Sequence, residues 1–201
     1  MLIPKPTMST VSATMQGVTP GLLLNPFGRK AEEQLLASMQ KKVAKVARAD
    51  KDPAREYEER LAEVTVDAEK HIFWTNVLAF KSAMLRGAKS MDKLPMTVVR
   101  EGVFVIPDSV VDGQPRAHVV GTAEPYSTHV RNQGGSVDYR TRVLLSTWTY
   151  RLDFQVNTAV MSVDQALTCL VNAGVGTGIG DWRPEKNGVH GRWTVTDAEV
   201  K

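Results

Sequence analysis

Apolar and polar residues alternate strictly between Trp148 and Val156, which is the clearest hydrophobic pattern in the chain. The apolar positions are Trp148, Tyr150, Leu152, Phe154 and Val156, and the polar positions between them are Thr149, Arg151, Asp153 and Gln155. A period of two residues is typical of a strand that buries one face. The pattern therefore predicts a half-buried strand over this segment.

A short helix and a last strand are predicted after it. Ser162 stands three residues before Gln165, which is the spacing of a capping box. Apolar residues then recur at helical spacing, at Ala166, Leu167, Leu170 and Val171. We expect a helix from about Val163 to Ala173. Trp193 and Val195 alternate with polar neighbours and predict a final strand.

The first half of the chain carries a similar set of patterns. Val11, Ala13 and Met15 alternate with polar residues, which predicts a strand that ends at Gly17. Asn76 can cap a helix, and Val98 to Ile106 is predicted as a further strand. The order β-α-β-β-α-β indicates one ferredoxin-like, or RRM-like, α+β domain over residues 1–201, in which two helices cover one face of an antiparallel sheet.

Two insertions interrupt this order. Residues 25–74 are predicted as a helical hairpin, whose second helix opens at Asp52-Pro53. The lysines of its first helix, at positions 41, 42 and 45, either bind a partner or form a solvated face. Residues 108–139 are polar and rich in glycine and proline, and we expect a loop there. Arg140 and Arg142 follow two residues apart, so an extended backbone would point both to one face.

A glycine-rich segment from Gly174 to Gly191 holds six of the fifteen glycines. Glycine lets the backbone adopt positive φ and approach another surface closely. Guanidinium and indole groups, which phosphates and unpaired bases favour, lie among the glycines. The predicted nucleic-acid contacts are Trp182, Arg183, Lys186 and Arg192, with Arg140 and Arg142 beside them, and the predicted loop backbone is Gly176, Gly178, Gly180, Gly188 and Gly191.

A purely structural interpretation of this segment stays open. Gly174 would then cap the preceding helix, the later glycines would form a turn, and both tryptophans would lie in the core. Trp193 is expected in the core under either interpretation. The glycines follow a helix and no Gly-Lys-Ser/Thr occurs, so neither the dinucleotide fingerprint nor the phosphate loop is present, and we expect no cofactor.

Composition limits the remaining classes. The net charge of +3 and the pI near 9.0 are only mildly basic, so binding to a polyanion would depend on local clustering of cations. No apolar window approaches a membrane span, and the single cysteine cannot form an internal disulfide. We expect a cytoplasmic protein without membrane contact.

Evidence for catalysis is weak in this sequence. The four histidines are scattered without metal spacing, and Cys169 has the surroundings of a small core residue. Asp153 and Asp181 could approach one another and hold a metal, which keeps a metal-dependent nuclease as a minor alternative. A contact of Asp181 with Arg183 that shapes the loop is the preferred interpretation. We therefore expect no enzyme and no metal site.

The motif Gly178-Ile-Gly-Asp-Trp-Arg-Pro184 followed by Gly191-Arg-Trp193 resembles the closing motif of uncharacterised bacteriophage proteins. In that family, positions corresponding to Tyr139–Arg142 and Pro20–Asn25 carry an arginine-rich strand start and an apolar segment. More distantly, a glycine-rich loop after the second helix that ends in Gly-Arg-aromatic resembles the RAMP proteins of CRISPR effector complexes, including the Cas7-like subunits that bind RNA. The resemblance implies host cytoplasm if the chain is phage-encoded.

These patterns together predict a non-enzymatic protein that binds nucleic acid, most readily single-stranded RNA or DNA. The competing class is a structural or protein-interaction subunit, which would assemble with itself as a homo-oligomer or inhibit a host defence complex. The projecting insertions favour self-association, because RAMP-like subunits use such parts to reach their neighbours.

Overall fold

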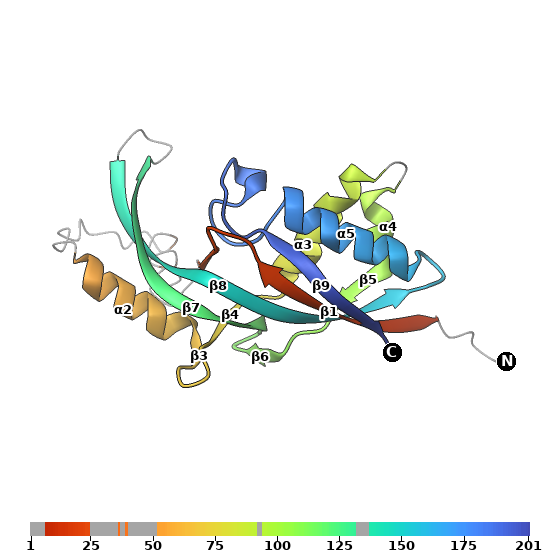
Figure 1. Cartoon of the computed structure of the whole chain (residues 1–201), viewed down its shortest axis with the longest axis horizontal. Helices are drawn as coiled ribbons and strands as arrows, with labels where there is room; N and C mark the ends of the chain where they lie inside the picture. The colour runs from red at the N-terminus through yellow and green to blue at the C-terminus, as the bar shows by residue number, and fades with distance from the viewer. Residues whose placement is uncertain (1–6, 25–35, 37–38, 40–51, 92–93, 132–136) are drawn as a thin grey trace.

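The structure is a computed structural model that describes residues 7–24, 36, 39, 52–91, 94–131 and 137–201 (Figure 1). These residues form a mixed α+β protein on an antiparallel sheet, which confirms the class expected from the sequence. The strands are β1 (Met8–Gly17), β2 (Leu22–Leu24), β3 (Thr65–Asp67), β4 (Ile72–Asn76), β5 (Val103–Val105), β6 (Ser109–Val111), β7 (Gln114–Arg131), β8 (Val137–Asn157) and β9 (Trp193–Val200). The helices are α2 (Pro53–Val64), α3 (Leu78–Gly87), α4 (Met96–Gly102) and α5 (Val163–Gly176), with short 3₁₀ turns η1 (Ala88–Ser90) and η2 (Pro184–Lys186).

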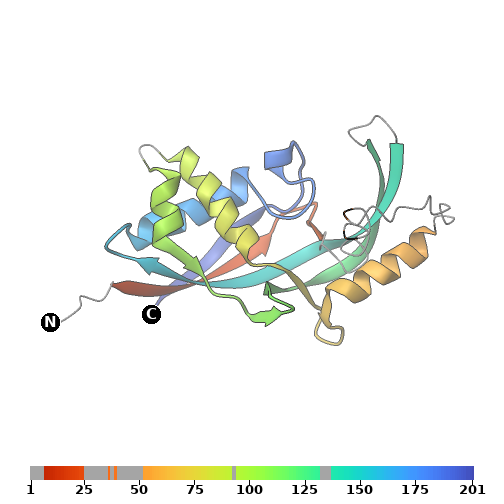
Figure 2. The same cartoon turned by 180° about the vertical axis from the view of Figure 1, so that it is seen from behind.

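The sheet has the strand order β3-β4-β7-β8-β1-β9, and every neighbouring pair is antiparallel. β2 and β5 also pair with β8, and β6 pairs with β7. β7 and β8 form one long hairpin that curves away from the rest of the sheet (Figures 1 and 2). We call the outer part of this hairpin, residues 123–131 and 137–145, the arm.

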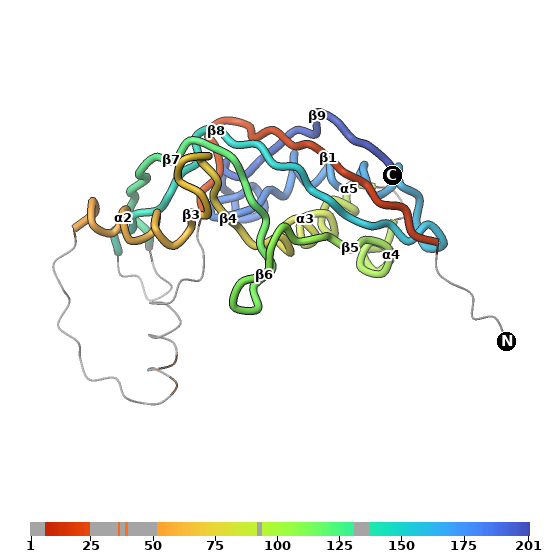
Figure 3. Tube along the Cα trace, turned by 90° about the horizontal axis from the view of Figure 1, so that it is seen from below, coloured from red at the N-terminus to blue at the C-terminus, as the bar shows by residue number. Residues whose placement is uncertain are grey.

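Helices α3, α4 and α5 lie together on one face of the sheet (Figure 3). Phe80 of α3 stacks on Tyr150 of β8 with ring centroids 5.1 Å apart and meets the edge of Trp193 at 5.7 Å. α3 and α5 approach so closely at Gly87 that a Cβ there would lie 2.4 Å from the Cys169 carbonyl oxygen. The opposite face of β1, β8 and β9 carries none of the described helices and is referred to below as the open face.

The elements with strong local patterns form as predicted. The segment Trp148–Val156 lies within β8, and its apolar residues are buried. The capping box of α5 is complete, because the Ser162 hydroxyl accepts from the Gln165 amide at 3.1 Å and the Gln165 side chain accepts from the Ser162 amide at 2.9 Å. Asp52 caps α2, and the Asn76 side chain accepts from the Leu78 amide at the start of α3.

Two predictions of secondary structure are wrong. The polar insertion at 108–139 is not a loop, because most of it forms β6 and β7. Its inward positions are the small Ala117, Val119 and Gly121; a Cβ at Gly121 would lie 2.4 Å from the Thr147 carbonyl oxygen. The segment Val98–Ile106 is also not one strand, since it is divided between α4, which buries Val99, and the short β5.

The insertion at 25–74 is helical only in part. Its second helix is confirmed as α2, but β3 and β4 follow within the same insertion and extend the sheet. The first helix of the predicted hairpin lies outside the described residues, apart from positions 36 and 39. Among the helices that the structure describes, none is both long and apolar enough to cross a membrane.

Candidate functional site

The segment between α5 and β9, residues 177–192, is called the glycine loop below. It is anchored to the body of the protein by backbone hydrogen bonds. The Asp181 amide donates to the Leu23 carbonyl at 3.1 Å, the Gly191 amide donates to the Gly21 carbonyl at 2.8 Å, and the Ile179 amide donates to the Gly191 carbonyl at 3.0 Å. These bonds hold the loop against β2 and close it on itself.

The glycines of the loop are required by its own packing. A Cβ at Gly188 would lie 1.7 Å from the Trp182 carbonyl oxygen, and a Cβ at Gly180 would lie 2.4 Å from the Leu23 carbonyl oxygen. Gly180 also has a positive φ of 73°. Gly178 and Gly191 have positive φ as well, whereas Gly176 belongs to α5 and has open space around it. The close packing of the backbone therefore explains the glycine run without a ligand.

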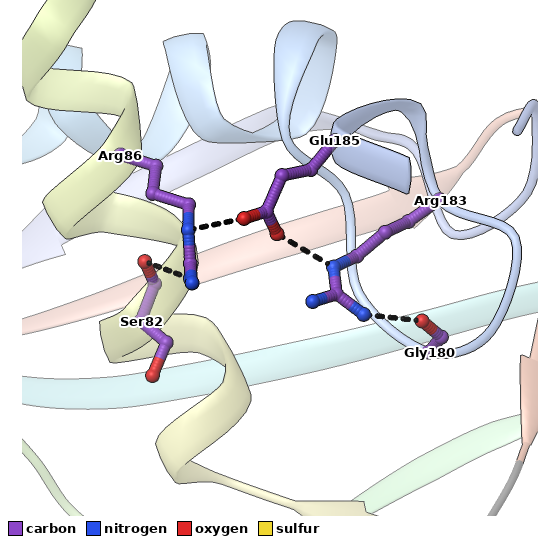
Figure 4. A network of polar contacts seen from close by, with 5 residues as sticks. All are labelled: Ser82, Arg86, Gly180, Arg183 and Glu185. Carbon is purple, nitrogen blue, oxygen red and sulfur yellow. Dashed lines mark hydrogen bonds and ion pairs between the residues drawn. The ribbon is translucent and has the colours of Figure 1, made fainter. Parts of the chain in front are cut away.

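Arg183 braces the glycine loop (Figure 4). Its Nε donates to Glu185 Oε2 at 2.9 Å, and its Nη1 donates to the Gly180 carbonyl oxygen at 3.0 Å. The other oxygen of Glu185 forms an ion pair with Arg86 of α3, and Arg86 also donates to the Ser82 carbonyl at 3.2 Å. The guanidinium of Arg183 thus joins η2 to the start of the loop, and Glu185 joins both to α3.

Trp182 is held in a fixed position at the surface. Its backbone has φ of 50°, in the left-handed region, and its carbonyl accepts from the His190 amide at 3.0 Å. The ring of Tyr126 on the arm meets Trp182 edge-on, with centroids 6.4 Å apart, and meets His190 at 5.3 Å. Trp182 remains 38% exposed, which is a large exposed fraction for an indole in an ordered loop.

Arg142 joins the arm to the glycine loop from the same side. It stands opposite Tyr126 in the β7–β8 register, so both side chains share one face of the hairpin. Arg142 is buried, and its Nε donates to Asp181 Oδ2 at 2.7 Å. Its Nη1 is also buried and has no hydrogen-bond partner among the described residues. The expected pairing of Asp181 with Arg183 is therefore wrong, because the arm brings Arg142 to this carboxylate.

The remaining predicted cations are distributed around this junction. Arg140 lies two residues farther along the arm, is exposed, and forms an ion pair with Asp138 at 3.2 Å. Lys186 is exposed at the end of η2, and its side chain has no ion pair within the described part of the chain. Arg192 is not in this cluster. Its carbonyl accepts from the Val18 amide at 3.0 Å directly before β9, and its Nε is buried without a hydrogen-bond partner among the described residues.

Two members of the cluster were not singled out from the sequence. Tyr126 lies in the segment expected to be a loop, and the spacing of His190 from the other three histidines carries no metal-site signal. His190 is 4% exposed, and this burial lowers its pKa, while a hydrogen bond to the Gly21 backbone acts in the opposite direction. The imidazole is therefore neutral near pH 7. The pairing of β7 with β8 brings Tyr126 to Trp182, and the closure of the glycine loop on itself places His190 beside them.

The structure does not bring the two aspartates together. Asp181 contacts Arg142, whereas Asp153 lies on the same strand as Arg142 but eleven residues farther along, roughly 36 Å at the usual rise of a strand. Asp153 instead accepts from the Ser12 hydroxyl at 2.5 Å. No group of three histidine, cysteine, aspartate or glutamate side chains within the described ranges could hold a metal ion. Cys169 is fully buried, and burial raises its pKa to about 11, which opposes formation of a thiolate.

Comparison of the sequence with models of known protein families and with curated proteins gives no match. The functional interpretation therefore depends on the geometry of the site.

Proposed function

We propose that this chain binds single-stranded nucleic acid, RNA or DNA, without catalysing a reaction on it. The binding surface is the junction at which the glycine loop packs against the arm. The observation that carries the proposal is the exposed ring of Trp182, held by a left-handed backbone and by the edge of Tyr126. A fixed aromatic ring offers a stacking surface to a base and loses little side-chain entropy when the base binds.

Cationic groups near this ring support the same proposal. Lys186 is exposed in the same loop, and Arg140 is exposed on the arm. Arg142 holds Asp181 through Nε, and its buried Nη1 is available to an acceptor that enters the junction. These groups would contact phosphates, which carry most of the affinity in nucleic-acid binding. We assign Arg183 to the support of Trp182, because its hydrogen bonds are made inside the loop.

We also infer that β1, α3, β7, β8, α5 and β9 form a ferredoxin-like unit. The antiparallel order β9-β1-β8-β7 and the placement of α3 and α5 on one face support this inference. β3, β4 and β6 would then be additions to one edge. We propose on the same basis that the chain is related to the phage and RAMP proteins it resembles, and that it acts in the host cytoplasm.

The decisive experiment measures the affinity of labelled oligothymidylate and oligouridylate by fluorescence anisotropy at several salt concentrations. Trp182→Ala should weaken binding by about 1–3 kcal/mol with little change in salt slope. Lys186→Gln should reduce the slope of log affinity against log salt by about 0.7. Val189→Ala is the matched control, because Val189 is exposed in the same loop and carries neither a ring nor a charge. If the wild-type protein binds neither strand at low salt, the proposal is wrong.

A structural subunit that assembles with itself is the second candidate. The outer edge of β9 pairs with none of the described strands, so it is open to a strand from another copy. A bulge at Thr196 and the exposed Asp197 and Glu199 oppose such pairing. Light scattering with and without oligonucleotide separates the candidates, since a strict monomer under both conditions excludes self-assembly.

A further inference from the structure

A second surface feature lies on the open face, where β1, β7 and β8 meet the turn between β3 and β4. It is an open pocket of about 480 Å³. The lining residues Gln16, Val120, Thr122, Thr147 and Thr149 alternate with the buried Met15, Val119 and Trp148, so these side chains point away from the core. Trp148 itself and the glycines at 17 and 121 also contribute to the lining. The lining consists of Gln16, Gly17, Thr19, Lys70, His71, Val120, Gly121, Thr122 and residues 146–149.

The lining of this pocket is rich in hydrogen-bond donors and contains no carboxylate. The donors include the Lys70 ammonium, the His71 imidazole, and several serine and threonine hydroxyls. Two carboxylates contact lining residues: Asp67 pairs with Lys70 at 3.2 Å, and Glu124 accepts from the Ser146 hydroxyl at 2.6 Å. The ion pair of Lys70 is exposed and weak, so the ammonium can reorient towards a ligand.

Two backbone features fix the shape of the pocket. Ser146 is the extra residue of a β-bulge, since Thr122 pairs with Thr147 and Ala123 pairs with Leu145. His71 has φ of 54°, a left-handed conformation that is uncommon outside glycine, and its carbonyl accepts from the Gly121 amide at 3.1 Å. Bulges and strained residues recur next to binding sites, where they aim side chains at a ligand.

A second cation, Arg192, lies at the margin of the pocket. The Arg192 carbonyl accepts from the Val18 amide, and Val18 stands between the lining residues Gly17 and Thr19. The Nε of Arg192 is buried and has no hydrogen-bond partner among the described residues. Lys70 and His71 are neighbours in the turn between β3 and β4, and Arg192 lies beside the pocket on a second segment, directly before β9.

We propose that this pocket binds the phosphate group of a nucleotide. The Lys70 ammonium and the nearby Arg192 guanidinium, together with the His71 imidazole and the hydroxyl donors, suit a compact anion with several acceptor oxygens. A neutral sugar would make no use of the two cations. The phosphate can come from a free mononucleotide or from the backbone of a nucleic acid. The site is separate from the junction of the glycine loop and the arm, so it does not depend on the function proposed above.

The test is a titration followed by the backbone amide resonances of Gly17, Gly121 and Thr122. The probes are inorganic phosphate, adenosine monophosphate, adenosine and oligothymidylate. The variants are Lys70→Gln and His71→Asn; asparagine tolerates the left-handed backbone and lacks the imidazole. Lys89→Gln is the matched control, because Lys89 is an exposed lysine of η1, remote from the pocket lining.

Phosphate and adenosine monophosphate should give saturable shifts at these amides, and adenosine should not. Each pocket variant should weaken adenosine monophosphate about ten-fold, the effect of one charge-assisted hydrogen bond, while the control retains wild-type affinity. Saturation by oligothymidylate but not by adenosine monophosphate would assign the phosphate to a nucleic-acid backbone. Equal shifts with adenosine, no saturable shift with any phosphate, or unchanged affinity in both variants would overturn the proposal. Because Gly17, Gly121 and Thr122 line the pocket, their amide shifts report this site and not the junction around Trp182.

Discussion

The brace formed by Arg183 makes a quantitative prediction about stability. Arg183→Ala removes one hydrogen bond to Glu185 and one to the Gly180 carbonyl. The side chains of Arg183 and Glu185 are 26% and 23% exposed, so their interaction lies between that of a surface pair and that of a buried charged pair. We expect a loss of about 1–2 kcal/mol. For a domain of this size, that loss lowers the melting temperature by about 2–8 °C.

Thermal unfolding followed by circular dichroism measures this effect. Glu185→Gln should destabilise at least as much, because the carboxylate also pairs with Arg86. The double variant should lose less than the sum of the single losses, since Arg183 and Glu185 share an interaction. Lys186→Ala is the control, because this exposed lysine has no ion pair within the described residues. It should melt within experimental error of the wild type.

The opposite outcome would restore the role expected from the sequence. If Arg183→Ala melts like Lys186→Ala but binds oligonucleotide more weakly with a reduced salt slope, Arg183 contacts phosphate and does not brace the loop. Additive losses in the double variant would equally refute the shared interaction.

Three further predictions test the loop and its surroundings. Burial lowers the pKa of His190, so this residue binds a proton more readily in the unfolded chain than in the folded protein. The free energy of unfolding should therefore fall as the pH drops below about 6.5. His190→Gln should reduce this dependence in urea titrations at pH 5 and 7.5. Gly188→Ala should lower the free energy of unfolding by about 1–3 kcal/mol, because its Cβ would meet the Trp182 carbonyl. Gly176→Ala lies in a helix with open space around it, so it should be neutral or stabilising by up to about 1 kcal/mol. Equal effects of the two variants in urea unfolding would contradict the packing of the loop. Ser162→Ala should cost about 1 kcal/mol by removing the cap of α5, and an unchanged urea midpoint would count against the capping box.

Elements specified by local patterns were predictable from the sequence. The central part of β8 shows strict alternation, and α5 carries a capping box and apolar residues at helical spacing. Such signals are local, because they require only the periodicity of one element and its end residues. The core position of Trp193 follows in the same way, from its alternation with polar neighbours in β9.

The local residue pattern did not predict strand β7, and the reason is physical. Its inward residues are small because neighbouring backbone and side chains fill the space above them, as at Gly121 beside Thr147. Glycine and proline in a polar segment are typical of loops, and only pairing with β4, β6 and β8 makes this segment a strand. The same pairing places Tyr126 in contact with the glycine loop.

The sequence by itself determined that the segment after α5 carries glycine, tryptophan and arginine together, but the tertiary structure decided what each residue does. Arg142 meets Asp181 across 39 positions of sequence, and Arg183 reaches Glu185 and Gly180 only because the loop closes on itself. Arg192 lies directly before β9, where its carbonyl accepts from the Val18 amide, and not in the cluster around Trp182. Contacts between side chains distant in sequence are fixed by the strand register and by backbone packing, and neither is encoded in the local pattern of residue types.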